Sequence, residues 1–186
     1  MLKISPRLVV GSLLALALVG PTAAAPSAAA AKKAAAGIEF NLRTVEGGSI
    51  TAEMLRGDVV VLAFGASWLP LSRTQVADVQ RLADEYKDRD VRVYWVSADS
   101  DKAQSKNYAT DEQLRSFTRK NGLKVGVLRD PDGAFFKTLG VERNQLPAVV
   151  ILDREGNVSE TVGGFDPGGN LVKQLSAQLN RLLTAQ

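Results

Sequence analysis

The sequence predicts an α/β fold, with a central mixed β-sheet flanked by helices. Two observations support this class. Short apolar runs rich in β-branched residues, typical of strands buried on both faces, alternate with segments of helical periodicity. Toward the C-terminus, two strand-like segments follow each other across a tight turn, which adds an antiparallel pair to the sheet. The predicted order of elements is ββαβα(α)ββα, where the bracketed helix is optional.

The first elements are an N-terminal β-hairpin extension, a buried strand and a long helix. The segment IEFNLRTV (38–45) alternates like a strand and ends at the two glycines 47–48, which suit a turn. The run VVVLAF (59–64) is continuous and apolar, as in a strand buried on both faces. A helix is predicted over about 71–87. Its buried stripe comprises Val76, Val79, Ala83 and Tyr86.

The middle of the chain predicts a second strand, VRVYWVSA (91–98), and a short helix within TDEQLRSFTRKNG (110–122). A Thr-Asp pair gives this helix a start signal, and a glycine gives it a stop. The polar and charged run 97–112 is interpreted as a solvated loop that lengthens the connection between the strand and the helix.

The last third of the chain predicts a hairpin followed by a helix. PAVVILD (147–153) is typical of a buried strand, and VSETVGG (158–164) is expected to pair with it across an Asp-Arg-Glu-Gly turn. Asp166 and Pro167 are predicted to form the N-cap and first turn of the last helix. The buried stripe of that helix is predicted to comprise Leu171, Leu175, Leu179, Leu182 and Leu183.

The N-terminal segment, 1–25, is predicted to be a secretory signal peptide. Lys3 and Arg7 precede the 13-residue uncharged run LVVGSLLALALVG (8–20), and small residues with Ala-x-Ala cleavage options follow. The apolar run is shorter than the roughly 20 residues that span a bilayer. An uncleaved anchor that uses the alanine tract as extra length is the alternative, and only then is membrane contact expected.

Two further assignments follow from the signal peptide. Residues 26–36, PSAAAAKKAAA, have low complexity and are expected to form an Ala-rich disordered tether. Residues 37–186 are expected to form one folded domain. The mature protein is expected in the periplasm, or elsewhere outside the cytoplasm of a bacterium.

The composition excludes most redox and metal chemistry. The chain contains no cysteine and no histidine, which removes disulfides, thiolates, Ser-His catalysis, and cysteine and histidine metal ligands. No cofactor and no metal site are therefore expected. The formal net charge is +3, and no basic block is interleaved with aromatic residues, so nucleic acid is not an expected partner.

Two motifs carry a resemblance to a known family. ITAEMLRGDVVVLAFGASWLPLSR (50–73) joins a strand to a helix through a Trp-x-Pro-x-Ser turn, and LPAVVILDREGNVSETVGGF (146–165) follows in the second half. Together they resemble the TlpA/ResA group of thioredoxin-like (redoxin) thiol–disulfide oxidoreductases, and the resemblance covers roughly 37–186. It implies a thioredoxin-like fold with a cis-proline. The matching scaffold positions are Gly57, Phe64, Ala66, Ser67, Trp68, Pro70, Arg73 and Pro147.

The same resemblance implies that the positions for thiol chemistry are degenerate. The two cysteines of the CxxC motif fall on Leu69 and Ser72, and the acidic proton-handling residue falls on Gln75. A buried position that is often acidic or amide in relatives falls on Ala63. Leucine has no nucleophile, and the serine hydroxyl has no histidine to activate it. No catalytic residue is assigned, and the chain is expected not to be an enzyme.

The resemblance also implies a peptide-binding edge. In thioredoxin-like folds, the segment before the cis-proline pairs through its backbone with an extended peptide, which requires no thiol. Large apolar side chains are expected opposite and beside this segment. The predicted binding residues are Trp68, Leu69, Pro70, Leu71, Leu146, Pro147 and Phe165. In the alternative, Leu69 and Leu71 fold down onto the helix start, Trp68 packs on the strand end and the surface binds nothing.

Three functions remain to be compared. The first is a redox-inactive, secreted thioredoxin-like domain, an accessory module that binds an extended peptide or a partner protein outside the cytoplasm. The second is a thiol–disulfide oxidoreductase by family descent, against which the absence of every cysteine argues. The third is a structural subunit of an envelope complex, in which the apolar surface forms an interface.

Overall fold

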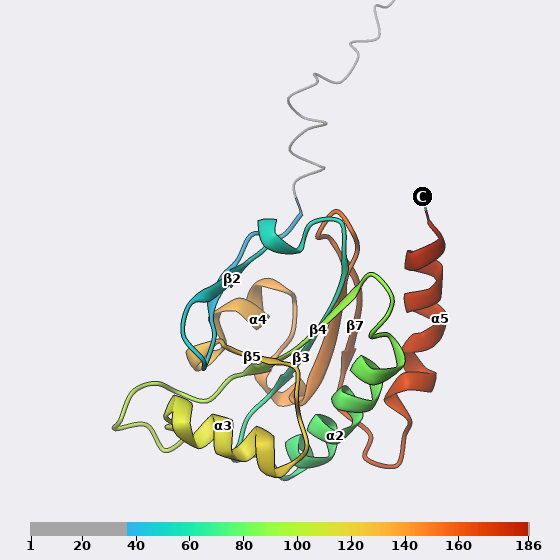
Figure 1. The fold of residues 1–186 in the computed structure, drawn as a ribbon. Helices are drawn as coiled ribbons and strands as arrows, with labels where there is room; N and C mark the ends of the chain where they lie inside the picture. The colour runs from blue at the N-terminus through green and yellow to red at the C-terminus, as the bar shows by residue number, and fades with distance from the viewer. Residues whose placement is uncertain (1–36, 186) are drawn as a thin grey trace, which may run out of the picture.

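A five-stranded mixed β-sheet lies at the centre of residues 37–185, the part of the chain that the computed structural model describes (Figure 1). The predicted signal peptide and tether lie outside the described residues. In chain order, the strands of the sheet are β3 (Val59–Gly65), β4 (Val91–Ser97), β5 (Gly126–Arg129), β6 (Ala148–Leu152) and β7 (Val158–Gly163). Their order across the sheet is β5-β4-β3-β6-β7.

The sheet combines a parallel part with an antiparallel part. β3 pairs in parallel with β4, and β4 with β5, whereas β6 runs antiparallel to both β3 and β7. The parallel pairs require crossover connections, which the helices supply. The carboxyl ends of β3 and β4 therefore meet the amino end of β6 at one end of the sheet. The candidate site lies there.

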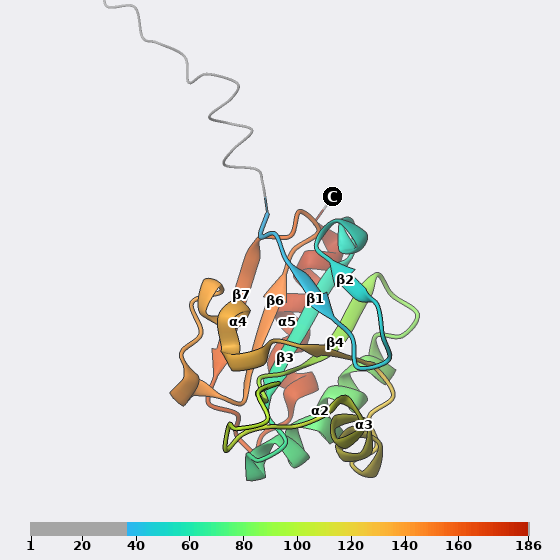
Figure 2. The same ribbon diagram turned by 90° about the vertical axis from the view of Figure 1, so that its left-hand side faces the viewer.

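Helices cover both faces of the sheet. α2 (Pro70–Glu85), α3 (Asp111–Lys120) and α5 (Leu171–Thr184) pack on one face. The short α4 (Ala134–Thr138) lies on the opposite face, together with an N-terminal hairpin (Figure 2). Single-turn 3-10 helices occur at η1 (Glu53–Leu55), η2 (Pro131–Gly133) and η3 (Arg143–Gln145). Within residues 37–185, none of the helices combines the length and the hydropathy needed to cross a bilayer.

The N-terminal hairpin is a separate two-stranded sheet. It consists of β1 (Asn41–Arg43) and β2 (Ser49–Thr51), which pair antiparallel. Gly47 and Gly48 lie in the turn between them, both with a positive φ that suits glycine. The predicted hairpin extension is therefore confirmed, and the α/β class with a mixed central sheet is confirmed with it.

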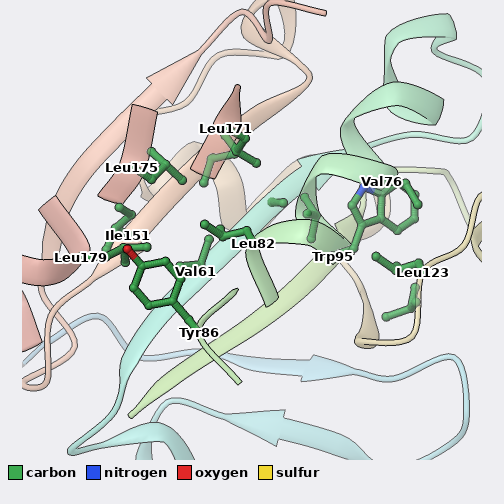
Figure 3. Close-up of a cluster of buried hydrophobic side chains, with 14 of the residues drawn as sticks. Val61, Val76, Leu82, Tyr86, Trp95, Leu123, Ile151, Leu171, Leu175 and Leu179 are labelled. Atoms are coloured by element: carbon green, nitrogen blue, oxygen red, sulfur yellow. The ribbon is translucent and has the colours of Figure 1, made fainter. Parts of the chain in front are cut away.

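The core forms two layers because side chains alternate along β3, whose seven residues are all buried. On the α2 and α5 side, leucines of both helices pack around Val61, whereas the indole of Trp95 lies beside Val76 and Leu123 (Figure 3). On the other side, Phe64 packs among aromatic and aliphatic residues that include Phe135 and Phe136. Each fully buried side chain of this size contributes about 2 kcal/mol. The ends of β3, β4 and β6 are therefore firmly held.

The predicted order of elements has one strand where the N-terminal hairpin has two, and it omits β5. This strand is only four residues long, so it offers too few alternations to predict from sequence. It pairs with β4 along one side, and the hairpin covers part of the other. Thr44 bridges Leu128 antiparallel, and the Val45 N–H donates to the Val127 carbonyl oxygen at 3.1 Å. Contacts distant in sequence thus define this strand.

The predicted start of the last helix at Asp166 is wrong. α5 begins at Leu171, and the side chain of its N-cap, Asn170, accepts a hydrogen bond from the Lys173 N–H at 2.9 Å. Asp166 instead closes a turn by accepting a hydrogen bond from the Gly168 N–H at 2.9 Å. Two glycines follow the Asp-Pro pair, and glycine disfavours a helical backbone, so the helix starts later.

Candidate binding site at the start of helix α2

The candidate site lies where β3 runs into α2. A tight turn joins them, in which the Leu69 N–H donates to the Ala66 carbonyl oxygen at 3.0 Å. Leu69 is the N-cap of α2, and Pro70 occupies the first helical turn, where a missing N–H costs nothing. This turn decides which of the predicted residues face the core and which face solvent.

Ser72, the counterpart of the second cysteine, points into the core. The residue is fully buried, and its Oγ accepts a hydrogen bond from the Ala66 N–H at 3.0 Å. The hydroxyl therefore supports the turn that starts α2. It is shielded from solvent, and the chain contains no histidine that could act as its base.

Gln75, the counterpart of the acidic residue, is also fully buried. Its Nε2 donates to the carbonyl oxygens of Phe64 and Ala148, both at 3.1 Å. Its Oε1 accepts a hydrogen bond from Trp95 Nε1 at 3.2 Å. Two donated bonds and one accepted bond suit a neutral amide, whereas an ionised carboxylate can only accept. The side chain thus ties α2 to β3, β4 and β6.

Gly65 allows these polar groups to pack closely. A Cβ at this position would lie 2.7 Å from Gln75 Oε1 and 2.9 Å from both Ser72 Oγ and Trp95 Nε1. Such distances are too short for a real side-chain carbon, so only glycine fits without a shift of its neighbours.

Asp99 is a second buried polar group at this end of the sheet. Its side chain is a hydrogen-bond acceptor for the Ser67 N–H at 2.8 Å, the Ser67 hydroxyl at 2.7 Å and the Ser97 hydroxyl at 2.8 Å. Only 1% of Asp99 is exposed. The carboxyl group therefore fixes the turn residue that immediately precedes Trp68.

The interpretation of 97–112 as a solvated loop is wrong for its first residues. Ser97, Asp99 and Ser100 are all buried, although the following residues 101–104 are exposed. One signal could have identified Asp99. The carboxyl ends of neighbouring parallel strands meet at the same end of a sheet, so a polar residue just after β4 is expected beside the residues just after β3.

A buried arginine holds the rest of this segment in place. Arg129 is 2% exposed and donates to the Ala109 carbonyl oxygen at 2.9 Å and to Asp111 Oδ1 at 3.4 Å. Burial lowers the pKa of Arg129. A hydrogen bond from Arg43 lowers the pKa of Asp111 below its usual value. This ion cluster stabilises the segment that leads from β4 to α3.

The opposite wall of the site is the start of β6. The Leu146–Pro147 peptide bond is cis, as the resemblance implied. The Phe165 N–H donates to the Pro147 carbonyl oxygen at 3.0 Å. Pro147 and Phe165 also line a small cavity of about 70 Å³ with Leu171, the first residue of α5. These contacts place Phe165 next to the cis-proline.

The predicted binding residues differ in exposure. Trp68 is 46% exposed and Leu71 is 39% exposed, and Pro70 is exposed too. The half-buried members of the set are Leu69, Leu146 and Phe165, and Pro147 is buried. Both halves of the set lie at one end of the sheet, because β3 and β6 pair with Phe64 opposite Ala148. Trp68, Leu69 and Leu71 do not line the cavity beside Pro147.

The backbone beside the cis-proline is available for pairing. The Leu146 carbonyl oxygen accepts no hydrogen bond from any residue that the structure describes. The Leu146 N–H donates to the Arg143 carbonyl oxygen at 3.4 Å, which is a long and weak bond. The Trp68 indole N–H likewise has no partner between residues 37 and 185. A metal-holding group of acidic residues is absent from this part of the chain.

The chain matches known proteins over most of its length. The AhpC/TSA family matches residues 32–161. Among curated proteins, thiol-disulfide oxidoreductase ResA of Bacillus thuringiensis subsp. konkukian is 26% identical over 125 residues. That match covers 67% of this chain and 66% of the relative. The chain thus spans just under two thirds of the length of this relative.

Solved structures with the same fold include two bacterial proteins. A putative thiol:disulfide interchange protein DsbE from Chlorobium tepidum is 24% identical, with a TM-score of 0.65, over 79% of this chain and 94% of that chain. The exposed lipoprotein thioredoxin of Streptococcus pneumoniae strain TIGR4 is 26% identical, with a TM-score of 0.60, over 75% of this chain and 99% of that chain. These matches confirm the predicted thioredoxin-like fold.

Proposed function

The chain belongs to the AhpC/TSA family, and we propose that it is a redox-inactive accessory module that binds an extended polypeptide. The bound segment pairs with the backbone at Leu146, and its side chains pack on Trp68, Leu69 and Leu71. The observation that carries this proposal is the contrast within one site. Two of the positions for thiol chemistry, Ser72 and Gln75, hold side chains that are hydrogen-bonded inside the protein, while Trp68 and Leu71 beside them are exposed.

The absence of thiols argues against disulfide exchange. That reaction requires a thiolate to attack a disulfide and a second thiol to resolve the mixed disulfide. The chain holds no cysteine anywhere, and the two corresponding positions are Leu69 and Ser72. Ser72 is fully buried and hydrogen-bonded to the turn, and Gln75 cannot ionise. Disulfide exchange therefore requires residues that this chain lacks.

The backbone beside Pro147 supports peptide addition. A free carbonyl oxygen and a weakly bonded N–H on Leu146 are the acceptor and donor that an extended segment needs to add as a strand. Trp68 and Leu71 provide exposed apolar area nearby, with an unpaired indole N–H available to hydrogen-bond a peptide carbonyl. The bound partner is accordingly expected to be an extended peptide with apolar side chains.

The module is expected to work outside the cytoplasm. This expectation depends on the predicted signal peptide in 1–25 and on its apolar run 8–20. The description of the Streptococcus pneumoniae relative as an exposed lipoprotein agrees with such a location. Fractionation of cells that express the full chain, with N-terminal sequencing of the mature protein, tests the location and the cleavage together.

Peptide selection tests the binding function directly. A displayed library of random peptides is selected against the full-length protein, and the Kd of the best synthetic peptide is measured by fluorescence anisotropy. Trp68→Ala and Leu71→Asp should each weaken binding about tenfold or more. Met54→Asp is the matched control, because Met54 is 62% exposed in η1, at the opposite end of β3. Binding that is unaffected by either site variant contradicts the proposal.

The two other candidate functions predict different results. An oxidoreductase by family descent would reduce insulin disulfides with dithiothreitol above the rate of the buffer, whereas we expect no acceleration. A structural subunit would self-associate or assemble through the same apolar surface. Light scattering would then show an oligomer of the full-length protein that Leu71→Asp dissociates and Met54→Asp does not.

A further inference from the structure

A second concave site lies on the other side of α2, between α2 and α3. It is an open cleft with a volume of about 570 Å³. Its walls include Ser67, Arg73, Tyr108, Gln113, Ser116 and Lys120. None of the predicted binding residues lines it, so it is distinct from the peptide edge at Leu146. A cleft of this volume accommodates a small ligand or a few residues of a peptide.

The cleft carries positive charge that the protein does not neutralise. Arg73 projects from α2 and Lys120 from α3, and both are exposed. Neither forms an ion pair or a hydrogen bond with a residue in the described range. No acidic residue lines the cleft, and the first turn of α2 contains none. The two cations are therefore available to an incoming anion.

Several arginines elsewhere on the surface are already neutralised and are not available to a ligand in this way. Each is paired with a neighbouring carboxylate: Arg43 with Asp111, Arg56 with Glu39, Arg92 with Asp58 and Arg115 with Glu112. The cleft instead places two unpaired cations on facing helices. A ligand with negative charge would gain two favourable contacts there, and no acidic lining residue would repel it.

Neutral groups in the cleft add hydrogen-bond donors. Gln113 uses its Oε1 to accept from the Thr110 N–H at 2.8 Å in a capping box, which leaves its Nε2 to donate. The Ser116 hydroxyl has no partner among residues 37–185. The Phe117 ring also lines the cleft and adds an apolar surface; its centroid lies 5.7 Å from the centroid of the Trp95 ring. The cleft therefore combines cations, neutral donors and an aromatic surface.

We propose that this cleft binds a ligand that carries carboxylate groups. The planar guanidinium of Arg73 can hold one carboxylate with two parallel hydrogen bonds, and the Lys120 ammonium can hold a second. Gln113 and Ser116 would donate to the remaining carboxylate oxygens. The carboxylates can come from a free dicarboxylic acid or from neighbouring acidic residues of a peptide. This site does not depend on the peptide edge, and either can fail while the other stands.

Nuclear magnetic resonance titration tests the proposal with defined probes. The full-length, ¹⁵N-labelled protein is titrated with succinate, with N-acetyl-Asp-Asp-amide, with their neutral counterparts succinamide and N-acetyl-Asn-Asn-amide, and with inorganic phosphate. We expect saturable shifts of the Arg73, Ser116 and Lys120 amide signals with the acidic probes and none with the neutral ones. Tighter binding of succinate indicates a free acid, and tighter binding of the dipeptide indicates an acidic peptide.

Charge-removing variants locate the effect. Arg73→Gln and Lys120→Gln should each weaken binding of the tighter acidic probe about fivefold, and added salt should weaken this binding further. Lys137→Gln is the matched control, because Lys137 is exposed on α4 and does not line the cleft. The proposal is overturned if no acidic probe gives saturable shifts, if the neutral probes or phosphate bind as tightly, or if the control weakens binding equally.

Discussion

The start of α2 has an inner side and an outer side, and the two are built from different chemistry. On the inner side, Ser72, Gln75 and Asp99 are buried, and each forms hydrogen bonds within the protein. On the outer side, Trp68 and Leu71 are exposed, and the indole N–H has no described partner. Two of the positions for thiol chemistry, Ser72 and Gln75, therefore hold the fold here, whereas the neighbouring surface at Trp68 and Leu71 is exposed to solvent.

Removal of the Gln75 amide should have the largest effect on stability. In Gln75→Ala, the Trp95 indole N–H and the carbonyl oxygens of Phe64 and Ala148 lose their partner in a dry environment. Unpaired buried groups are costly, so we expect a loss of about 3 kcal/mol in the free energy of unfolding. Urea denaturation measures it. A loss below about 1 kcal/mol would mean that the inner side does not hold the fold.

An acid at the same position should destabilise the protein in a pH-dependent way. In Gln75→Glu, an ionised carboxylate would face two carbonyl oxygens, so burial and these contacts raise the pKa of the introduced group above its usual value of about 4.3. The protonated carboxyl group can donate to a carbonyl oxygen and fits this site, whereas the ionised carboxylate cannot donate and does not fit.

The sign of this dependence follows from the raised pKa. The folded state of Gln75→Glu binds the proton more strongly than the unfolded chain does, so its stability is fully present below the unfolded pKa. That stability is lost as the pH rises through the folded pKa. We expect the variant to lose about 2 kcal/mol between mild acid and neutral pH, relative to the unmodified protein. A loss that is the same at every pH between these limits contradicts the geometry.

A restored cysteine pair would test whether the turn keeps the geometry of its redox-active relatives. In the double variant Leu69→Cys and Ser72→Cys, the new thiols lie at the N-cap and in the first turn of α2, where a disulfide is expected to form under mild oxidation. Mass spectrometry detects the loss of two hydrogens, and the oxidised form should be about 2 kcal/mol more stable than the reduced form. A pair that stays reduced shows that the turn is built differently.

The ion cluster behind the site should have a smaller, acid-sensitive effect. The hydrogen bond between Arg43 and Asp111 lowers the pKa of the Asp111 carboxyl group, so ionised Asp111 stabilises the folded state. This contribution is fully present above the usual value of 3.8 and is lost as the pH falls through the lower folded pKa. Asp111→Asn should therefore cost about 1 kcal/mol at neutral pH and less in acid. If the loss of stability in Asp111→Asn does not shrink in acid, ionised Asp111 is not the source of the stabilisation.

Changes on the outer side should leave stability nearly unchanged. Leu71 is 39% exposed, so Leu71→Asp should alter the free energy of unfolding by about 0.5 kcal/mol or less, although it should impair peptide binding. Urea denaturation of Leu71→Asp and of Gln75→Ala under the same conditions compares their losses in the free energy of unfolding directly. Equal losses for the two variants would mean that Leu71 belongs to the core and that the two sides do not differ.

Elements with a strong local pattern could be predicted from the sequence. β3, α2 and β6 combine long apolar runs or clear periodicity with the two motifs that identify the fold. β5 could not be predicted, because its four residues depend on pairing with β4 and on the cover of the hairpin. The Asp-Pro signal predicts a start of α5 that is too early, because the two glycines that follow it outweigh it.

The site was predicted less completely than the fold. The motifs predict the places of Leu69, Ser72 and the cis-proline. They do not predict that Gln75 joins three strands through one amide. The sequence predicts Asp99 in a solvated loop, whereas its burial depends on how β3 and β4 lie side by side. Burial of a polar residue within a polar run is set by tertiary contacts and leaves no local pattern.

The proposed function rests on the binding of an extended peptide through the backbone beside the cis-proline. The most direct measurement is a solution structure of the complex with the selected peptide, solved from intermolecular nuclear Overhauser contacts. We expect the peptide backbone to lie beside Leu146, with peptide side chains against Trp68 and Leu71. Contacts confined to another surface, with the Leu146 and Trp68 signals unchanged, would contradict the account.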